Sequence, residues 1–271
     1  MSLSNCAENQ QAKHLAEISC FMTPYKGIFT SVFLIRTEQG ALLFDAASDD
    51  SDIRDMVLPW LTEQGITSEQ LKYVFISHKH ADHAGGLPAL LEAFPDLCVV
   101  SQSASLQDKY SVSRFLLPQD GEMLLGCLRV VSIPGHTIDS AALLDTRSRT
   151  LICGDCLQLY GIFGEGKWGA NIPYPTEHRS AIARLREMEI EGILAAHHYH
   201  PLGRIYRGRE EISAALDACL APLDRMEALI AAHPDMTDEE VCALYNDAPM
   251  TPTLGAHVIK AMRRAMNEKN V

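Results

Sequence analysis

One segment, HKHADH at residues 78–83, limits what this chain can fold into more than any other feature of its sequence. It follows directly on the run 71–77 (LKYVFIS), whose aromatic and β-branched residues indicate a strand. Residues two apart in an extended chain point the same way, so His78 and His80 can face one metal ion. A fold that contains this segment therefore places the end of a strand at an open site.

The second half of the segment points to a second metal. Asp82 and His83 are expected in a loop that leads to Gly85-Gly86, and neighbouring loop residues can diverge toward a site a few ångströms away. Imidazole and carboxylate ligands without thiolate suit zinc, manganese, iron or nickel at a hydrolytic centre rather than a closed structural zinc.

Three more polar residues come directly after predicted strands. His136 follows the run 128–133 through Pro134-Gly135, Asp155 follows 150–153, and His197 follows 192–196. Loops at strand ends gather at one edge of a sheet, where open binding sites lie. We therefore expect these three side chains to join the cluster at residues 78–83.

Strands and helices interleave over the first two hundred residues and indicate an α/β (α+β) domain. Apolar runs predict strands, and three- to four-residue spacing predicts helices. The expected strands are 28–36, 41–45, 71–77, 97–101, 128–133, 141–145, 150–153 and 192–196, and the expected helices are 50–64, 87–94 and 176–188. After about residue 205 the pattern is helical only, with a capping box predicted from Thr237 and Glu240. The prediction is one domain over 1–205 and a C-terminal helical region over 206–271.

The ordered set HKHADHAGG, PGHT, CGDC and ILAAHHYHP resembles the metallo-β-lactamase superfamily, over roughly residues 15 to 205. The resemblance implies an αββα sandwich of two mixed β-sheets with flanking helices and a dinuclear site at one edge. It implies two divalent metal ions, zinc first, with iron, manganese and nickel as alternatives. In that arrangement His78, His80 and His136 hold the first metal, Asp82, His83 and His197 hold the second, and Asp155 bridges both.

Two features depart from the family pattern. The last ligand usually lies in a P-G-H segment, whereas this strand ends Ala195-Ala196-His197 with His198 and His200 close by. The register of the strand favours His197. Cys153 and Cys156 flank Asp155 as a C-x-x-C pair, for which a redox or thiolate-ligand role competes with simple packing, and packing is the preferred interpretation.

The chemistry expected of this site is hydrolysis. Two metals a few ångströms apart generate a hydroxide near neutral pH, and Asp82 is expected to orient it as well as to bind metal. The ligand form resembles the glyoxalase II, lactonase and class B3 β-lactamase branches, which implies cleavage of an ester, thioester, lactone or lactam in a small molecule. The basic glutathione-binding residues of glyoxalase II find no match here. The G-x-S-x-G elbow of a serine hydrolase is absent.

Three alternatives stay open at this level. The chain could be a phosphodiesterase or nuclease of the same superfamily, a mono-iron persulfide-oxidising enzyme, or a non-catalytic metal-binding regulatory protein. Phosphodiester hydrolysis faster than ester hydrolysis would favour the first, and one iron per chain would favour the second. Hydrolysis that survives replacement of Asp82 by Ala would favour the third.

The composition of the chain limits the kinds of binding partner that can be expected. The net charge of −12 disfavours nucleic acid, and no run approaches the ~20 apolar residues of a membrane span. The first residues carry no apolar run typical of a signal peptide, and the eight cysteines are scattered, which favours reduced thiols in the cytoplasm. The expected partner is a small-molecule substrate, with a homodimer left open.

The roles of the loop 157–175 and of several isolated residues are less clearly indicated by the sequence. The aromatic residues of the loop either line a substrate pocket or pack the loop in place, with neither favoured; they are Tyr160, Phe163, Trp168 and Tyr174. Asp45 is expected to be a turn residue rather than a partner of a ligand histidine. Four histidines are expected to take no part in the site: His14, His178, His233 and His257.

Overall fold

The computed structural model of the chain describes residues 18–165, 168–247 and 252–268, and these residues form two six-stranded mixed sheets. The first sheet has its strands in chain order: β1 (Ile18–Tyr25), β2 (Ile28–Thr37), β3 (Gly40–Phe44), β4 (Leu71–Phe75), β5 (Cys98–Val100) and β6 (Phe115–Leu116). The second runs in the reverse order, from β12 to β7: β12 (Gly203–Arg207), β11 (Gly192–Tyr199), β10 (Thr150–Cys153), β9 (Ala141–Asp145), β8 (Leu128–Ser132) and β7 (Met123–Leu124).

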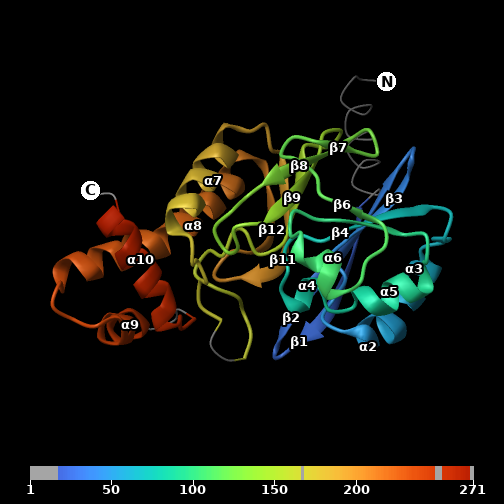
Figure 1. Cartoon of the computed structure of the whole chain (residues 1–271). Helices are drawn as coiled ribbons and strands as arrows, with labels where there is room; N and C mark the ends of the chain where they lie inside the picture. The colour runs from blue at the N-terminus through green and yellow to red at the C-terminus, as the bar shows by residue number, and fades with distance from the viewer. Residues whose placement is uncertain (1–17, 166–167, 248–251, 269–271) are drawn as a thin grey trace, which may run out of the picture.

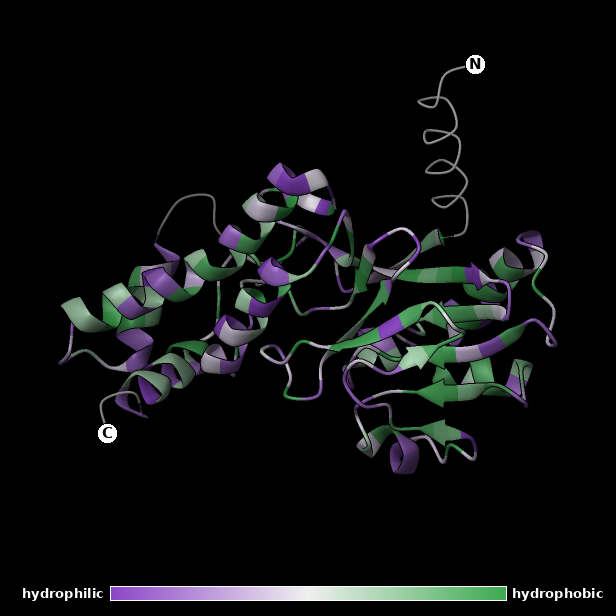
Figure 2. Cartoon of the chain, turned by 90° about the horizontal axis from the view of Figure 1, so that it is seen from above, coloured by the Kyte–Doolittle hydropathy of each residue, from purple (hydrophilic) through white to green (hydrophobic). Residues whose placement is uncertain are grey.

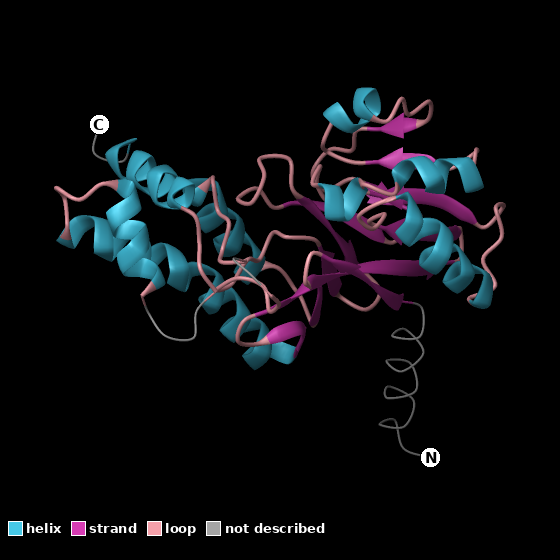
Figure 3. Cartoon of the chain, turned by 90° about the horizontal axis from the view of Figure 1, so that it is seen from below, coloured by secondary structure: helices cyan, strands magenta, loops and turns pink. Residues whose placement is uncertain are grey.

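Helices cover the outer face of each sheet, which gives the αββα order of layers expected from the sequence (Figure 1). The first sheet is covered by α2 (Asp50–Asp52), the π-helix η1 (Ile53–Val57), α3 (Leu58–Glu63) and α5 (Leu87–Ala93), with α4 (Ala81–Ala84) and α6 (Ser105–Lys109) at its edge. The second is covered by α7 (Pro175–Glu187) and the first half of α8 (Gly208–Ala232). Figure 3 shows the strands lying between these two groups of helices.

The strands read as unbroken apolar runs because both of their faces are buried. In β2, Val32 and Leu34 pack toward the helices, whereas Phe33 and Ile35 pack between the sheets. In β10, Leu151 and Cys153 face α7 and α8, while Ile152 faces the first sheet. Alternation of side chains therefore supplies three apolar layers from two sheets, and Figure 2 shows the strands predominantly hydrophobic.

The C-terminal helices form a further apolar cluster beside the sandwich. The second half of α8 packs with α9 (Asp238–Asn246) and α10 (Ala256–Glu268) around Met226, Tyr245 and Ile259. Ala170 and Ile172 from the loop before α7 join this cluster. The capping box predicted at the start of α9 is confirmed, since Thr237 accepts from the Glu240 amide and Glu240 accepts from the Thr237 amide. No helix among the described residues is long and apolar enough to span a membrane.

Several elements differ from the sequence predictions. The predicted helix 50–64 is divided by a π-helical turn into α2, η1 and α3. The predicted loop at Asp82 and His83 is instead the short helix α4. Four strands of the described residues were missed. Strand β1 is half exposed, β6 and β7 have only two residues each, and β12 is a short edge strand whose apolar pattern is weak.

Two glycines allow α4 to lie against the turn that follows β3. The amide of Gly85 donates to the Ala47 carbonyl and that of Gly86 donates to the Ala46 carbonyl, each at 3.1 Å. A Cβ at Gly85 would lie 1.8 Å from the Ser48 carbonyl oxygen, which is backbone and cannot move away alone. The approach of α4 to the sheet therefore requires a glycine at this position.

We predict that Gly85→Ala destabilises the protein by about 3 kcal/mol or more, because the added methyl group forces the backbone at Ser48 to shift. Urea unfolding followed by circular dichroism measures the change. Gly65→Ala is the matched control: its φ is +70°, and nothing lies within 4 Å of the added Cβ, so only the backbone cost of about 1 kcal/mol is expected. Equal losses in the two variants would contradict the close-packing argument.

Candidate metal centre

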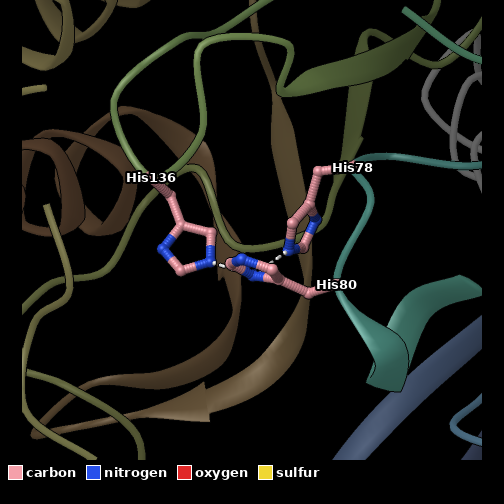
Figure 4. Close-up of side chains that lie close together, drawn as sticks. All are labelled: His78, His80 and His136. Carbon is pink, nitrogen blue, oxygen red and sulfur yellow. Dashed lines mark hydrogen bonds between the residues drawn. The ribbon is translucent and has the colours of Figure 1, made fainter. Parts of the chain in front are cut away.

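Three histidines from two strand ends form the first group of candidate ligands. His78 and His80 follow β4, and His136 lies in the Pro-Gly-His turn after β8. The Nδ1 atom of His80 lies 3.0 Å from Nε2 of His78 and 2.9 Å from Nε2 of His136 (Figure 4). Three nitrogens thus converge on one point, as the ligands of one metal ion do.

Two carboxylates and two histidines form the second group. Asp82 and His83 come from α4, Asp155 follows β10 and His197 lies in β11, and their ligand atoms lie within 4.8 Å of one another. All four side chains are buried. The structure therefore brings together all seven residues that the sequence singled out, in the same two sets.

Asp155 lies between the groups with one oxygen toward each. Its Oδ2 atom is 3.4 Å from Nε2 of His136 in the first group. Its Oδ1 atom is 2.9 Å from Nε2 of His197 and 3.1 Å from Nε2 of His83 in the second. A carboxylate in this position can bind both metals of a pair.

Hydrogen bonds on the far side of the rings orient two of the histidines unambiguously. Nδ1 of His136 donates to the Asn171 carbonyl at 2.8 Å, and Nδ1 of His197 donates to the Phe29 carbonyl at 2.7 Å. A carbonyl can only accept, so the proton must reside on Nδ1. In the neutral ring the Nε2 lone pair is then directed into the site, where it can bind metal.

Asp45 fixes His83 in the same way, although the sequence favoured a simple turn aspartate. This expectation was wrong. The Asp45 Oδ2 atom accepts from Nδ1 of His83 at 2.6 Å, and the same carboxylate accepts from the amide and the hydroxyl of Ser77 at 2.8 and 3.0 Å. Asp45 has a φ of +64° and a fully buried side chain. Its left-handed backbone turns the carboxylate toward His83 of α4, and no local sequence pattern predicts this contact.

The buried carboxylates favour positive charge on the groups around them. Burial alone would lower the pKa of His197, but Asp155 and Asp82 raise it to about 9. Burial alone would raise the pKa of Asp155, yet His197 and His83 hold it well below its ordinary value. In the first group, burial and the neighbouring histidines outweigh the attraction of Asp155, and the pKa of His80 is lowered to about 4.

The residues present fit divalent metal ions. The Nε2 atoms of His83 and His197 are fully buried without a hydrogen bond, although carboxylate oxygens lie about them. Such orphaned nitrogens are costly unless a ligand satisfies them. Five imidazoles and two carboxylates are also the donors that hydrolytic metal sites use.

The structure separates His197 from its two rivals. His197 lies inside β11, not beyond it as the sequence predicted, and the pairing of β11 with β12 shifts register between Leu194 and Tyr199. His198 and His200 instead pack on the ring of Phe163, at 5.2 and 4.9 Å between centroids. Neither belongs to the two groups found among the described residues.

Cys153 and Cys156 are buried behind the site. Both belong to the apolar cluster between the second sheet and its helices, together with Cys219. A neighbouring thiol and burial raise the pKa of Cys153 well above its ordinary value. Neither thiol joins a candidate metal group among the described residues, and the contacts support packing.

A cavity of about 320 Å³ opens above the two groups. Trp168 lines it, whereas Phe163 is 48 % exposed and packs on the histidines just described. Tyr160 and Tyr174 do not line it either. Of the two alternatives left open for this loop, pocket lining therefore applies to Trp168 and not to the other three aromatic residues.

His257 was wrongly placed outside the site. It lines this cavity, and its Nε2 atom lies 3.0 Å from the side-chain oxygen of Asn171, whose carbonyl holds His136. The sequence also missed Asn171 and Gln158, which hydrogen-bond to each other and belong to no sequence motif.

His178 is buried in α7, and a Cβ at Gly135 would lie 2.5 Å from its Nδ1 atom, so its ring supports the turn that carries His136. His14 lies outside the described residues.

Two mixed sheets between helical layers, with histidines and carboxylates gathered at one edge, define a class of αββα proteins that carry metals at that edge. A model of the metallo-beta-lactamase superfamily matches residues 25–197, and the chain belongs to this superfamily. Its members bind divalent metals and include many hydrolases.

Relatives of known name support the same grouping. The chain is 23 % identical over 219 residues to the atrochrysone carboxyl ACP thioesterase of Emericella nidulans, covering 78 % of this chain and 68 % of the relative. It is 30 % identical over 166 residues to the hydroxyacylglutathione hydrolase of Parasynechococcus marenigrum, covering 57 % and 62 %. The solved structure of a metallo-beta-lactamase family protein from Thermus thermophilus is similar with a TM-score of 0.68 at 18 % identity, covering 94 % and 95 %, which shows a shared fold.

We predict that Asp45→Asn lowers metal affinity about 10- to 100-fold, because an amide holds His83 less firmly than a carboxylate does. Competition with a chromophoric chelator measures the affinity. Asp108→Asn, an exposed change in α6, is the control and should leave it unchanged. An affinity that is unaltered in folded Asp45→Asn protein would show that this contact does not orient the ligand.

A second prediction concerns His178 and pH. Burial lowers its pKa to about 4, whereas an unfolded histidine has a pKa of about 6.5. The unfolded chain therefore binds the proton first, so stability is lost as the pH falls below about 6.5 toward 4. In chelator-treated protein, the loss in unfolding free energy between pH 7 and 4.5 should be smaller by about 2 kcal/mol in His178→Leu than in the native sequence. Equal losses in urea titrations at the two pH values would be inconsistent with a neutral buried imidazole.

Proposed function

We propose that this protein is a metal-dependent hydrolase that uses two divalent metal ions, zinc in the first instance, to cleave an ester, thioester, lactone or lactam in a small molecule. One observation carries the proposal: Asp155 presents one carboxylate oxygen to each of two convergent groups of ligand atoms. A pair of sites that share a carboxylate is the arrangement of two-metal hydrolytic centres. The names of the thioesterase and hydrolase relatives agree with acyl transfer to water.

The chain assigns distinct tasks to its residues. His78, His80 and His136 would hold one metal, Asp82, His83 and His197 the other, and Asp155 both. When bound, the metals supply an acidified water and polarise the carbonyl of the substrate. Asp82 lines the cavity as well as the second group, so its carboxylate can also hold the attacking water by a proton.

The surroundings of the cluster support preorganisation. Asp45 and the Asn171 and Phe29 carbonyls lock the rings of three of the five histidines. Fixed ligands need no rearrangement when charge develops on the substrate, which is the main source of electrostatic catalysis. A cytoplasmic location is proposed with this function, because the eight cysteines are scattered along the sequence and show no disulfide framework typical of small secreted domains.

We predict that Asp82→Ala lowers kcat by about 10²- to 10⁴-fold, because the variant loses a metal ligand and the group that orients water. The measurement is a panel of p-nitrophenyl esters, thioesters, lactones and β-lactams on protein whose metal content has been quantified. Asp235→Ala, an exposed change between α8 and α9, is the matched control. Full activity in folded Asp82→Ala protein would refute metal-dependent hydrolysis at this site, and faster cleavage of bis-(p-nitrophenyl) phosphate than of every ester would refute acyl substrates.

A further inference from the structure

The cavity above the candidate metal centre has a charged floor and an uncharged wall. Its floor is formed by the candidate ligands His80, Asp82, His136 and Asp155. Its wall includes the apolar side chains of Ile28, Ile162, Trp168, Leu254 and Val258, interspersed with the polar residues Tyr25, Gln158, Asn171, Thr253 and His257. Among the described residues that line it, none is lysine or arginine. A volume of about 320 Å³ lies near the lower end of small-molecule pockets.

The part of this wall around Leu254 is held in place by side chains of the C-terminal region. Asn246 accepts from the Leu254 amide at 2.9 Å and donates to its carbonyl at 3.0 Å. Gly169 donates to the Thr253 carbonyl at 2.9 Å, and a Cβ at Gly169 would lie 2.5 Å from the Leu254 amide nitrogen. This part of the wall is therefore a fixed surface.

This wall has a consequence for charged substrates. A carboxylate at the distal end of an acyl chain would leave water without finding a cationic partner among the described lining residues. Burying such an unpaired charge is costly, whereas an alkyl chain gains from leaving water. The net charge of −12 also repels anions from the protein as a whole.

We propose that the pocket selects a compact substrate whose acyl chain is uncharged and apolar, with Leu254 and Val258 forming the surface that receives the chain. The inference rests on the proposed hydrolase function and names its substrate class. Substrates with carboxylates far from the scissile bond, such as glutathione thioesters, are disfavoured by the same wall.

The test compares two thioesters that differ only in distal charge. Full-length, metal-loaded protein is assayed with the octanoyl and the 7-carboxyheptanoyl thioesters of N-acetylcysteamine. We expect kcat/KM to be at least about tenfold higher for the octanoyl thioester, with most of the difference in KM. A preference for the 7-carboxyheptanoyl thioester or for a glutathione thioester would overturn the inference while leaving the hydrolase proposal intact.

A positive charge placed on the wall should weaken the preference for the uncharged thioester. His257 is exposed and lines the cavity, so His257→Lys adds a cation without burying it in the core. This variant should narrow the ratio between the two thioesters by about tenfold. Asn267→Lys adds the same charge to an exposed position of α10 that does not line the cavity, and it should leave the ratio unchanged. Equal changes in this ratio for the two variants would mean that the cavity wall does not discriminate between charged and uncharged acyl chains.

A binding measurement separates this inference from the proposed function. Calorimetry with chelator-treated protein compares 2-nonanone with 8-oxononanoate, neither of which can be hydrolysed. Tighter binding of the uncharged ketone supports the inference even if none of the panel esters is cleaved. Equal or weaker binding of 2-nonanone would overturn it whatever the activity.

Discussion

The site depends on one buried carboxylate, that of Asp45. It accepts hydrogen bonds from the Ser77 amide and hydroxyl and from the His83 ring, while the Asp45 amide donates to Phe75. These contacts join the ends of β3 and β4 to the helix α4. The Ser77 hydroxyl also lies 3.1 Å from Nδ1 of His78, so one residue influences a histidine in each group. Burial raises the pKa of the Asp45 carboxyl, and the hydrogen bonds from His83 and Ser77 oppose that rise by favouring the ionised form.

Opposite charges of the buried carboxylates and histidines stabilise one another in the second group. Asp82 and Asp155 are buried beside His83 and His197, and the carboxylates raise the pKa of both rings while the rings lower the pKa of both carboxylates. Without metal, protons must supply the positive charge that the carboxylates require. Divalent ions would supply more of it and satisfy the buried Nε2 atoms directly. A centre organised in this way binds metal in competition with protons and holds its ligands in advance.

Asn171 connects the cluster with the C-terminal helices. Its carbonyl accepts from His136, its amide donates to Gln158, and its side chain contacts His257 at the start of α10. Gln158 in turn donates to the Asp155 carbonyl. The C-terminal helical region thus contributes part of the cavity wall. Through His257 it also contacts Asn171, which hydrogen-bonds to the ligand His136 and to Gln158 beside Asp155. The proposed selectivity and the proposed metal site therefore share this network.

The sequence by itself determined most strands and the seven candidate ligands, because periodicity and strand-end motifs are local properties of the chain. Tertiary structure decided the rest. Strand β11 extends through His197 to Tyr199 and shifts register against β12 after Leu194, and no local spacing encodes that pairing. Asp45 meets His83 across 38 positions, and Asn171 meets His257 across 86. Contacts over such separations arise only when the sheets and helices pack together, so the supports of the site and the wall of its pocket were invisible until the chain was folded.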